Sequence, residues 1–290
     1  MAPRWGIPLA VASIMLAFAG NSVITRYIIL GGLATPYILT TVRFASGLAM
    51  LLLVRTIAPG LSTHRSGARL DLIGGVFLGA YAFSISFGYE FISAAAGTLV
   101  FYAFVVLTMA VFGYIREGDR PTRHSVAGQV LAVFGVGVIT FGGIRDVTPN
   151  GVALMAATGI SWGLYSVYGR GAADSEGYTF YTFLVVGAFS LALVPILGLV
   201  SPGALRIELA WNGLGLALFM GMISTALSYV LWNATLRRIT ASQGGVVQLT
   251  VPVLASSMGI LLLGEHLTAS LVIGAVAVLA GIYLNRVKPR

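Results

Sequence analysis

Residues 92–97 are ISAAAG, and residues 239–244, which begin 147 positions later, are ITASQG. Other residues recur at nearly the same spacing: Glu117 with Glu265, Gly128 with Gly274, and Gly135 with Gly281. Small loop insertions between two copies of one unit produce shifts of this size. The chain therefore contains an internal duplication, which we divide into a first copy over residues 1–146 and a second over residues 147–290.

The composition indicates an integral membrane protein. Hydrophobic residues make up 58% of the chain and charged residues 9%, whereas about 25% of residues are charged in an ordinary soluble protein. A membrane-spanning helix needs about 20 mostly apolar residues. Ten stretches meet this requirement: 6–26, 37–55, 70–89, 94–114, 125–142, 151–168, 178–199, 211–233, 241–263 and 268–286. We predict an all-α membrane protein of ten transmembrane helices with short connectors and no separate soluble domain.

Each copy of the repeat contains five of these predicted helices. Because five is odd, the second copy must enter the membrane from the opposite side to the first. Inverted repeats are typical of secondary transporters, in which a central site opens alternately to the two faces of the membrane. The duplication therefore predicts two inverted five-helix repeats around a central cavity. A duplicated structural bundle without transport activity is the alternative.

The basic residues predict the orientation in the membrane. If the N-terminus is cytoplasmic, 13 Arg and Lys residues fall on the inner side and three, Arg26, Arg145 and Arg206, fall in outer connectors. The positive-inside rule then places both termini in the cytoplasm, with the protein in a bacterial-type inner membrane. The same distribution accounts for the net charge of +8. Nucleic-acid binding is not expected, because the basic residues stand singly or in pairs in short connectors.

The second copy carries a longer pattern. It consists of Ala241-Ser242-Gln243, Val251-Pro252-Val253 and Leu262-Leu263-Gly264-Glu265-His266-Leu267-Thr268, followed by Gly274 and Gly281. This pattern resembles the signature of EamA-type permeases of the drug/metabolite transporter superfamily, and the two-repeat layout of the whole chain is similar as well. Residues 93–139 form a weaker version, with Val105 in place of Pro252. Overall the chain most resembles the YddG-like amino-acid exporter branch, which implies amino-acid export.

Polar and aromatic side chains within the apolar helices are the candidate substrate contacts. A polar group facing lipid would cost several kcal/mol, so these side chains are expected to point inward. Within residues 211–233, Thr225, Tyr229 and Trp232 share one helix face. The full candidate set is Asn21, Tyr81, Ser84, Phe101, Tyr102, Trp162, Tyr165, Ser228, Tyr229, Trp232, Gln243 and Gln248. The alternative is hydrogen bonding between helices, together with aromatic residues at the membrane interface.

Charge is scarce inside the predicted spans. The nine acidic residues lie in connectors or at helix ends, and Glu90 is the one placed to reach the interior. A cationic drug would be held by an intramembrane carboxylate, which this chain lacks. Arg43 is the one cation well inside a predicted span. It either binds a substrate carboxylate or packs against helix-end carbonyls near the outer surface, and we favour the second interpretation.

Glycine spacing predicts how two of the helices pack. Gly128 and Gly135 are seven residues apart, as are Gly274 and Gly281. Seven residues are nearly two helical turns, so each pair forms a bare stripe that lets backbones approach closely in lipid. We predict that these stripes lie where the two repeats meet, away from the substrate, and a dimer interface is the alternative.

Pro252 interrupts the hydrogen-bond ladder within residues 241–263 and is a candidate hinge. Simple bending of the helix is the alternative. Glu117 and Glu265 each follow a span beside a tight turn, and Glu265 stands just before the next helix. We expect these carboxylates to cap helix starts in preference to relaying protons.

These observations predict an exporter of small neutral or zwitterionic metabolites, above all neutral or aromatic amino acids, that works by alternating access. A multidrug or other metabolite exporter on the same fold is the alternative. An enzyme is not expected, because His64, His124 and His266 lie in connectors and no zinc or diphosphate motif is present. No cofactor or metal is expected, and the partners are a small-molecule substrate and the lipid bilayer. The oligomeric state stays open and is compatible with a monomer.

Overall fold

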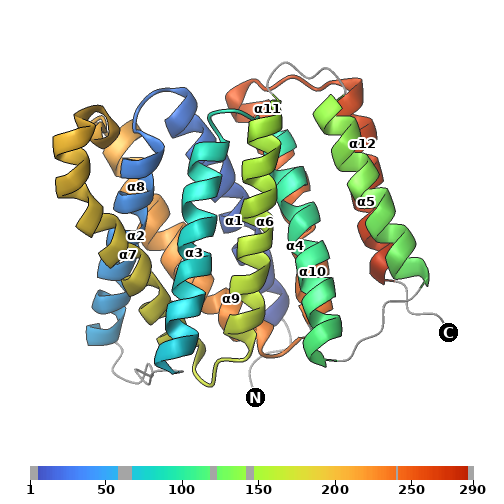
Figure 1. Cartoon of the computed structure of the whole chain (residues 1–290), viewed down its shortest axis with the longest axis horizontal. Helices are drawn as coiled ribbons and strands as arrows, with labels where there is room; N and C mark the ends of the chain where they lie inside the picture. The colour runs from blue at the N-terminus through green and yellow to red at the C-terminus, as the bar shows by residue number, and fades with distance from the viewer. Residues whose placement is uncertain (1–5, 58–66, 118–122, 142–146, 240, 287–290) are drawn as a thin grey trace.

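The computed structural model describes residues 6–57, 67–117, 123–141, 147–239 and 241–286. Every regular element within these ranges is helical (Figure 1). The elements are α1 (Gly6–Leu30), α2 (Pro36–Ile57), α3 (Ala68–Gly88), α4 (Ala94–Glu117), α5 (Arg123–Phe141), α6 (Pro149–Arg170), α7 (Ser175–Val200), η1 (Pro202–Leu205), η2 (Trp211–Gly215), α8 (Leu216–Phe219), η3 (Met220–Leu227), α9 (Ser228–Leu236), α10 (Ala241–Val247), α11 (Thr250–Leu263) and α12 (Ala269–Arg286).

The helices form one elongated bundle (Figure 1). α5 and α12 pack against each other at one end of the long axis, and α2 and α7 lie at the other. α1, α3, α4 and α6 occupy the middle, where α6 packs against both α3 and α4. The start of α1 and the end of α12 lie on the same side of the bundle, which is the side drawn lowest in Figure 1.

Length and composition make these helices suited to a bilayer. Within the described ranges, six helices are long and apolar enough to cross a membrane, and Thr250–Leu263 and Ala269–Gly281 are shorter apolar helices. Large apolar side chains remain exposed on the outside, among them Leu199 at 87% and Leu261 at 80%. Such a surface is stable against acyl chains but not against water. The predicted all-α, apolar class is confirmed, and the count of ten crossings stays a prediction.

The stretch predicted as one helix over residues 211–233 is less regular than expected. η2 and η3 have the wider π-helical turn, and only α8 and α9 are α-helical. Gly221 of η3 packs directly on α2, because a Cβ there would overlap the Ser46 hydroxyl and the Arg43 carbonyl. π-helical turns are frequent at functional sites, where the extra residue turns the following side chains to a new direction. Here Thr225 of η3 and Tyr229 of α9 both contact Arg43 of α2.

The helix break predicted from Pro252 is present, on the N-terminal side of the proline. The helix is interrupted four residues earlier, at Gln248, between α10 and α11. Gln248 carries the carbonyl that an N–H at position 252 would bond, and Pro252, in the first turn of α11, has no N–H to donate. Any hinge in this segment therefore centres on Gln248 and Leu249, with Pro252 fixing the start of the helix that follows.

α5 and α12 pack along their glycine stripes. A Cβ on Gly135 would lie 2.7 Å from the Gly274 carbonyl oxygen, and one on Gly281 would overlap the Gly128 carbonyl. The two backbones therefore touch, as small residues allow in membrane helices. The pair joins the two halves of the chain at one end of the bundle, away from the middle (Figure 1).

Glu265 caps a helix other than the one we predicted. Its carboxylate oxygens accept the backbone N–H groups of Ala94 at 2.5 Å and Ala95 at 2.9 Å, which begin α4. A carboxylate is stabilising at a helix start, because the first amides have no partner within the helix and carry partial positive charge. Glu265 thus links the second half of the chain to the first. The side chain of Glu117 lies outside the part that the structure describes.

Arg26 completes this cap. It was predicted in an outer connector, but it belongs to α1 and is 5% exposed. Its Nη1 donates to the Tyr89 carbonyl at 2.5 Å, and its Nε lies 4.0 Å from Glu265 Oε1. The buried cation is therefore compensated both by a carboxylate and by a backbone carbonyl.

Candidate substrate-binding site

One charged side chain lies among the aromatic residues inside the bundle. Arg43 of α2 is 1% exposed. Its Nε donates to Thr225 Oγ1 at 2.8 Å, and its Nη2 donates to Tyr229 Oη at 2.9 Å and to Tyr81 Oη at 3.3 Å. Tyr229 Oη donates in turn to Tyr81 Oη at 2.9 Å. The interpretation that we favoured, packing of Arg43 against helix-end carbonyls, is wrong, because side chains of α3, η3 and α9 hold it.

Aromatic rings surround this network. Trp162 packs against Tyr81 and Tyr229 with ring centroids 4.9 Å and 4.8 Å apart. Phe18 meets Trp162 edge-on at 5.4 Å, a favourable arrangement for aromatic pairs. We call the following set the aromatic cluster: Phe18, Phe44, Tyr81, Phe101, Tyr102, Trp162, Tyr165, Phe183, Tyr229 and Trp232. Its side chains are almost fully buried.

Two amide side chains flank the cluster, and each is already oriented by hydrogen bonds. Asn21 Oδ1 accepts from Ser224 Oγ at 2.6 Å and from Thr225 Oγ1 at 3.4 Å. Gln248 Oε1 accepts from Trp162 Nε1 at 2.6 Å. Both amide oxygens therefore accept at least one hydrogen bond, and Gln248 lies at the break between α10 and α11.

Arg43 has no acidic partner among the described residues. Its Nη1 is buried without a hydrogen bond. The buried Asp71 lies in the first turn of α3, about 15 Å along the helix from Tyr81. Glu90 was predicted to reach the interior, but its side chain is exposed in the α3–α4 connection, where partial burial raises its pKa. A buried cation without a counter-ion carries a desolvation penalty of several kcal/mol, so this position favours an anionic group.

The structure brings together most of the side chains predicted to contact substrate. Tyr81, Phe101, Tyr102, Trp162, Tyr165, Tyr229 and Trp232 are in the aromatic cluster, with Asn21 and Gln248 beside it. Ser84 is only half-buried and takes no part in this network. Ser228 donates back to the Ser224 and Thr225 carbonyls of its own helical segment. The side chain of Gln243 lies outside the part that the structure describes.

Three members of the cluster were missed: Phe18, Phe44 and Phe183. Phe44 and Phe183 are apolar rings, which are stable on either face of a membrane helix, so residue type alone does not distinguish them from lipid-facing residues. Phe18 had a usable signal, because it precedes Asn21 by three residues and three-residue spacing keeps side chains on one helix face.

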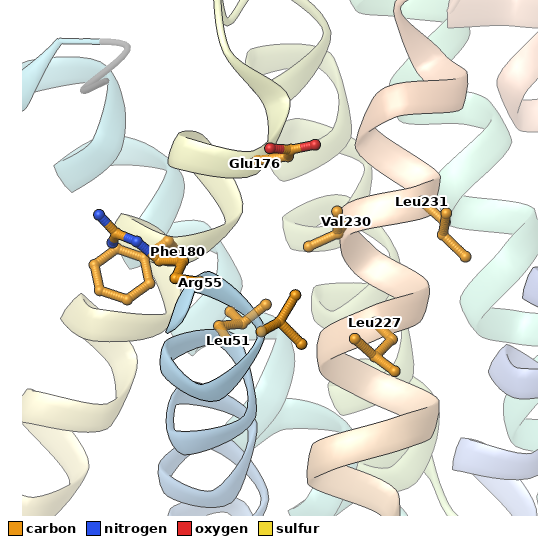
Figure 2. A pocket seen from close by; sticks show the side chains of 8 residues that line it. Leu51, Arg55, Glu176, Phe180, Leu227, Val230 and Leu231 are labelled. Carbon is orange, nitrogen blue, oxygen red and sulfur yellow. The ribbon is translucent and has the colours of Figure 1, made fainter. Parts of the chain in front are cut away.

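A mostly apolar cavity of about 240 Å³ lies between α2, α7 and α9 (Figure 2). It is lined by Leu51, Val54, Arg55, Glu176, Phe180, Leu227, Val230 and Leu231. Arg55 stacks on the Phe180 ring at 4.3 Å, as Figure 2 shows. Phe183, one turn from Phe180, packs against bare Gly47 and meets the Tyr229 ring at 5.7 Å. This cavity shares no lining residue with the aromatic cluster, to which Phe183 belongs.

The chain is similar to known proteins in both sequence and fold. The EamA-like transporter family matches residues 149–287. An uncharacterized protein of Pseudomonas aeruginosa is 35% identical over 93% of this chain and 91% of its own length. The chain belongs to the EamA-like transporter family. As a member of a transporter family it is a multi-pass membrane protein and not an enzyme, as the sequence predicted.

Two further similarities extend this assignment. A Salmonella typhimurium protein named a probable amino-acid metabolite efflux pump is 28% identical over 72% of this chain and 73% of its own length. A solved crystal structure covers 97% of both chains with a TM-score of 0.72 at 20% identity. At that identity the structural match shows a shared fold alone. The substrate of this EamA-family chain has to be argued from its own residues.

Proposed function

We propose that this transporter exports small neutral or zwitterionic metabolites, above all neutral or aromatic amino acids, from a site formed by Arg43 and the aromatic cluster. The observation that carries the proposal is the free Nη1 of a fully buried arginine that lies among aromatic rings. A carboxylate placed there would supply the missing counter-ion, and the rings would enclose an apolar side chain. Binding sites for small molecules commonly combine apolar walls with a few fixed polar groups.

We also propose that residues 1–146 and 147–290 are inverted five-helix repeats that make up the ten crossings. One support is a pair of equivalent arginines near the ends of α1 and α6. Arg26 donates to the Tyr89 carbonyl in the α3–α4 connection, and Arg170 donates to the Ile239 carbonyl in the α9–α10 connection. A second support is the composition of the site, to which both halves contribute. Sites at the interface of two such repeats suit alternating access.

In the proposed orientation both termini face the cytoplasm of a bacterial-type inner membrane, and one chain forms the whole transport unit. The position of the start of α1 and the end of α12 on the same side of the bundle supports an even number of crossings (Figure 1). The excess of basic residues on that side supports the cytoplasmic assignment. Tagging each terminus and testing its accessibility in inverted membrane vesicles would check it.

Flux into proteoliposomes tests the substrate. Purified protein is expected to move labelled phenylalanine, threonine or methionine, and Trp162→Ala or Tyr81→Ala is expected to reduce that flux without loss of folded protein. Absence of flux for every amino acid would reject the substrate, and unchanged flux in both variants would reject the site. A multidrug exporter predicts competition by lipophilic cations, whereas a buried arginine without a counter-ion repels them.

A further inference from the structure

The hydrogen-bonding capacity around Arg43 is unbalanced. The guanidinium has five N–H donors, and its described bonds engage Nε and Nη2 while Nη1 stays without a partner. Tyr81 Oη accepts from Arg43 and from Tyr229. Its own O–H has no acceptor among the hydrogen bonds of the described residues. The hydrogen-bonding groups around Arg43 that stay without a partner, Arg43 Nη1 and the Tyr81 O–H, are therefore donors.

The acceptors described near the cluster are neutral, and most of them already accept a hydrogen bond. The Asn21 amide oxygen accepts two hydroxyl groups, and the Gln248 amide oxygen accepts the Trp162 indole N–H. One amide oxygen stays without a partner, that of Asn233, but it lies against Gly169. Gly169 is seven residues, or about 10 Å, along α6 from Trp162. An α-amino group sits next to its carboxylate, so it cannot reach that oxygen while the carboxylate contacts Arg43.

A carboxylate and an ammonium group therefore meet opposite conditions here. A carboxylate brings only acceptors and one negative charge, which match the free donors and the positive charge of Arg43. An ammonium group brings three more donors and a second positive charge into a buried region without a described carboxylate at Arg43. Burying a charged group without a partner is strongly unfavourable.

From this imbalance we infer that the site recognises the carboxylate and the aromatic body of its substrate and not the amino group. An aromatic monocarboxylate that lacks the amine, such as a 2-oxo acid, is then a better ligand than the amino acid with the same side chain. The inference rests on the proposed function, because it specifies the substrate class of that same site. It makes Arg43 the residue that determines selectivity for net charge.

The test compares phenylalanine, phenylpyruvate and phenethylamine, which share a ring and differ in charge. Binding to purified wild-type protein in detergent is measured from the ligand-dependent rise in unfolding temperature. Flux of labelled phenylalanine and phenylpyruvate is measured in proteoliposomes, with protein-free liposomes as the leak control. We expect phenylpyruvate to bind at least tenfold more tightly than phenylalanine, and phenethylamine not to compete. Equal or tighter binding of phenylalanine would overturn the inference.

Arg43→Gln is expected to bring the affinity ratio of phenylpyruvate to phenylalanine close to one. Arg55→Gln is the matched control, because Arg55 also lies on α2 and stacks on an aromatic ring but lines the other cavity. A preference that survives Arg43→Gln, or that Arg55→Gln also abolishes, contradicts the inference. If Arg43→Gln does not fold, the ratio of the phenylpyruvate and phenylalanine affinities of the wild-type protein still decides the test.

The flux data separate this inference from the proposed function. Flux of phenylalanine without preference for phenylpyruvate overturns the inference and leaves amino-acid export standing. Flux of phenylpyruvate with none for any amino acid supports the inference and rejects amino acids as substrates. Absence of binding and flux for all of these compounds rejects both.

Discussion

Two buried arginines of this protein, Arg26 and Arg43, are in opposite electrostatic situations. Arg26 is 5% exposed, lies 4.0 Å from the Glu265 carboxylate and donates to a backbone carbonyl. Arg43 is 1% exposed and bonds only neutral hydroxyl groups among the described residues, with Nη1 left over. Both come from the first half of the chain, and both contact residues of the second.

The difference separates a structural role from a functional one. A buried charge with its counter-ion in place supports the fold, and removal of either partner leaves an uncompensated charge. A buried charge without a counter-ion adds little to stability, but an anion can bind to it. We therefore expect changes at Arg26 and Glu265 to affect stability and changes at Arg43 to affect transport.

The largest effect is expected from Arg43→Gln. Loss of charge-assisted hydrogen bonds to a substrate carboxylate removes about 3 kcal/mol, or about 100-fold in flux at low substrate concentration. The midpoint of thermal unfolding in detergent is expected to stay unchanged or rise, since an unpaired buried charge is removed. A variant that unfolds early would instead show that Arg43 supports the fold.

Glu265→Gln is expected to affect stability in preference to transport, the opposite of Arg43→Gln. It removes the charge from the α4 cap and leaves Arg26 without its carboxylate, which costs about 3 kcal/mol of stability. The unfolding midpoint should fall, and Arg26→Gln should lower it similarly. The double variant should be less destabilised than the sum of the two single changes. Additive losses would show that the two side chains do not interact.

Gly221→Ala tests the contact that positions Arg43. A Cβ at Gly221 would overlap the Ser46 hydroxyl and the Arg43 carbonyl, so η3 must move away from α2, at a cost of about 2 kcal/mol. Both flux and the unfolding midpoint are expected to drop. Gly137→Ala is the matched control, because no atom lies within 4 Å of the added Cβ. Wild-type behaviour of both variants would contradict the close contact.

The smallest effect is expected from Trp162→Phe. Phenylalanine keeps most of the aromatic surface but cannot donate to Gln248 Oε1, which costs about 1 kcal/mol. Flux should fall several-fold, mainly through a higher KM, and Gln248→Leu in the same background should add little further loss. If Gln248→Leu lowers flux as much in the Trp162→Phe variant as in the wild-type protein, the two side chains act separately.

The sequence predicted the class of fold and much of the site, because lipid imposes simple rules on it. Apolar runs must be helical, and polar groups within them must face inward. These rules placed Tyr81, Trp162 and Tyr229 in one interior correctly. They failed for Phe44 and Phe183, since an apolar ring is stable on either face of a membrane helix.

Errors occurred where a partner comes from a distant segment. Glu265 was expected to cap the helix that follows it, but it caps α4, 170 residues earlier. Arg26 was placed in a connector because an isolated arginine near a helix end gives no hint of a carboxylate across the bundle. The sequence also did not predict the π-helical η3, in which Gly221 packs directly against α2.

The sequence alone therefore determined that this protein is helical, apolar and poor in interior charge, because these properties follow from composition, helix length and residue spacing. The tertiary structure decided which of two buried arginines is compensated. Electrostatic compensation depends on which side chains the packed helices bring within a few ångströms. At Arg26 packing supplies a carboxylate, whereas at Arg43 it supplies only neutral hydroxyl groups among the described residues.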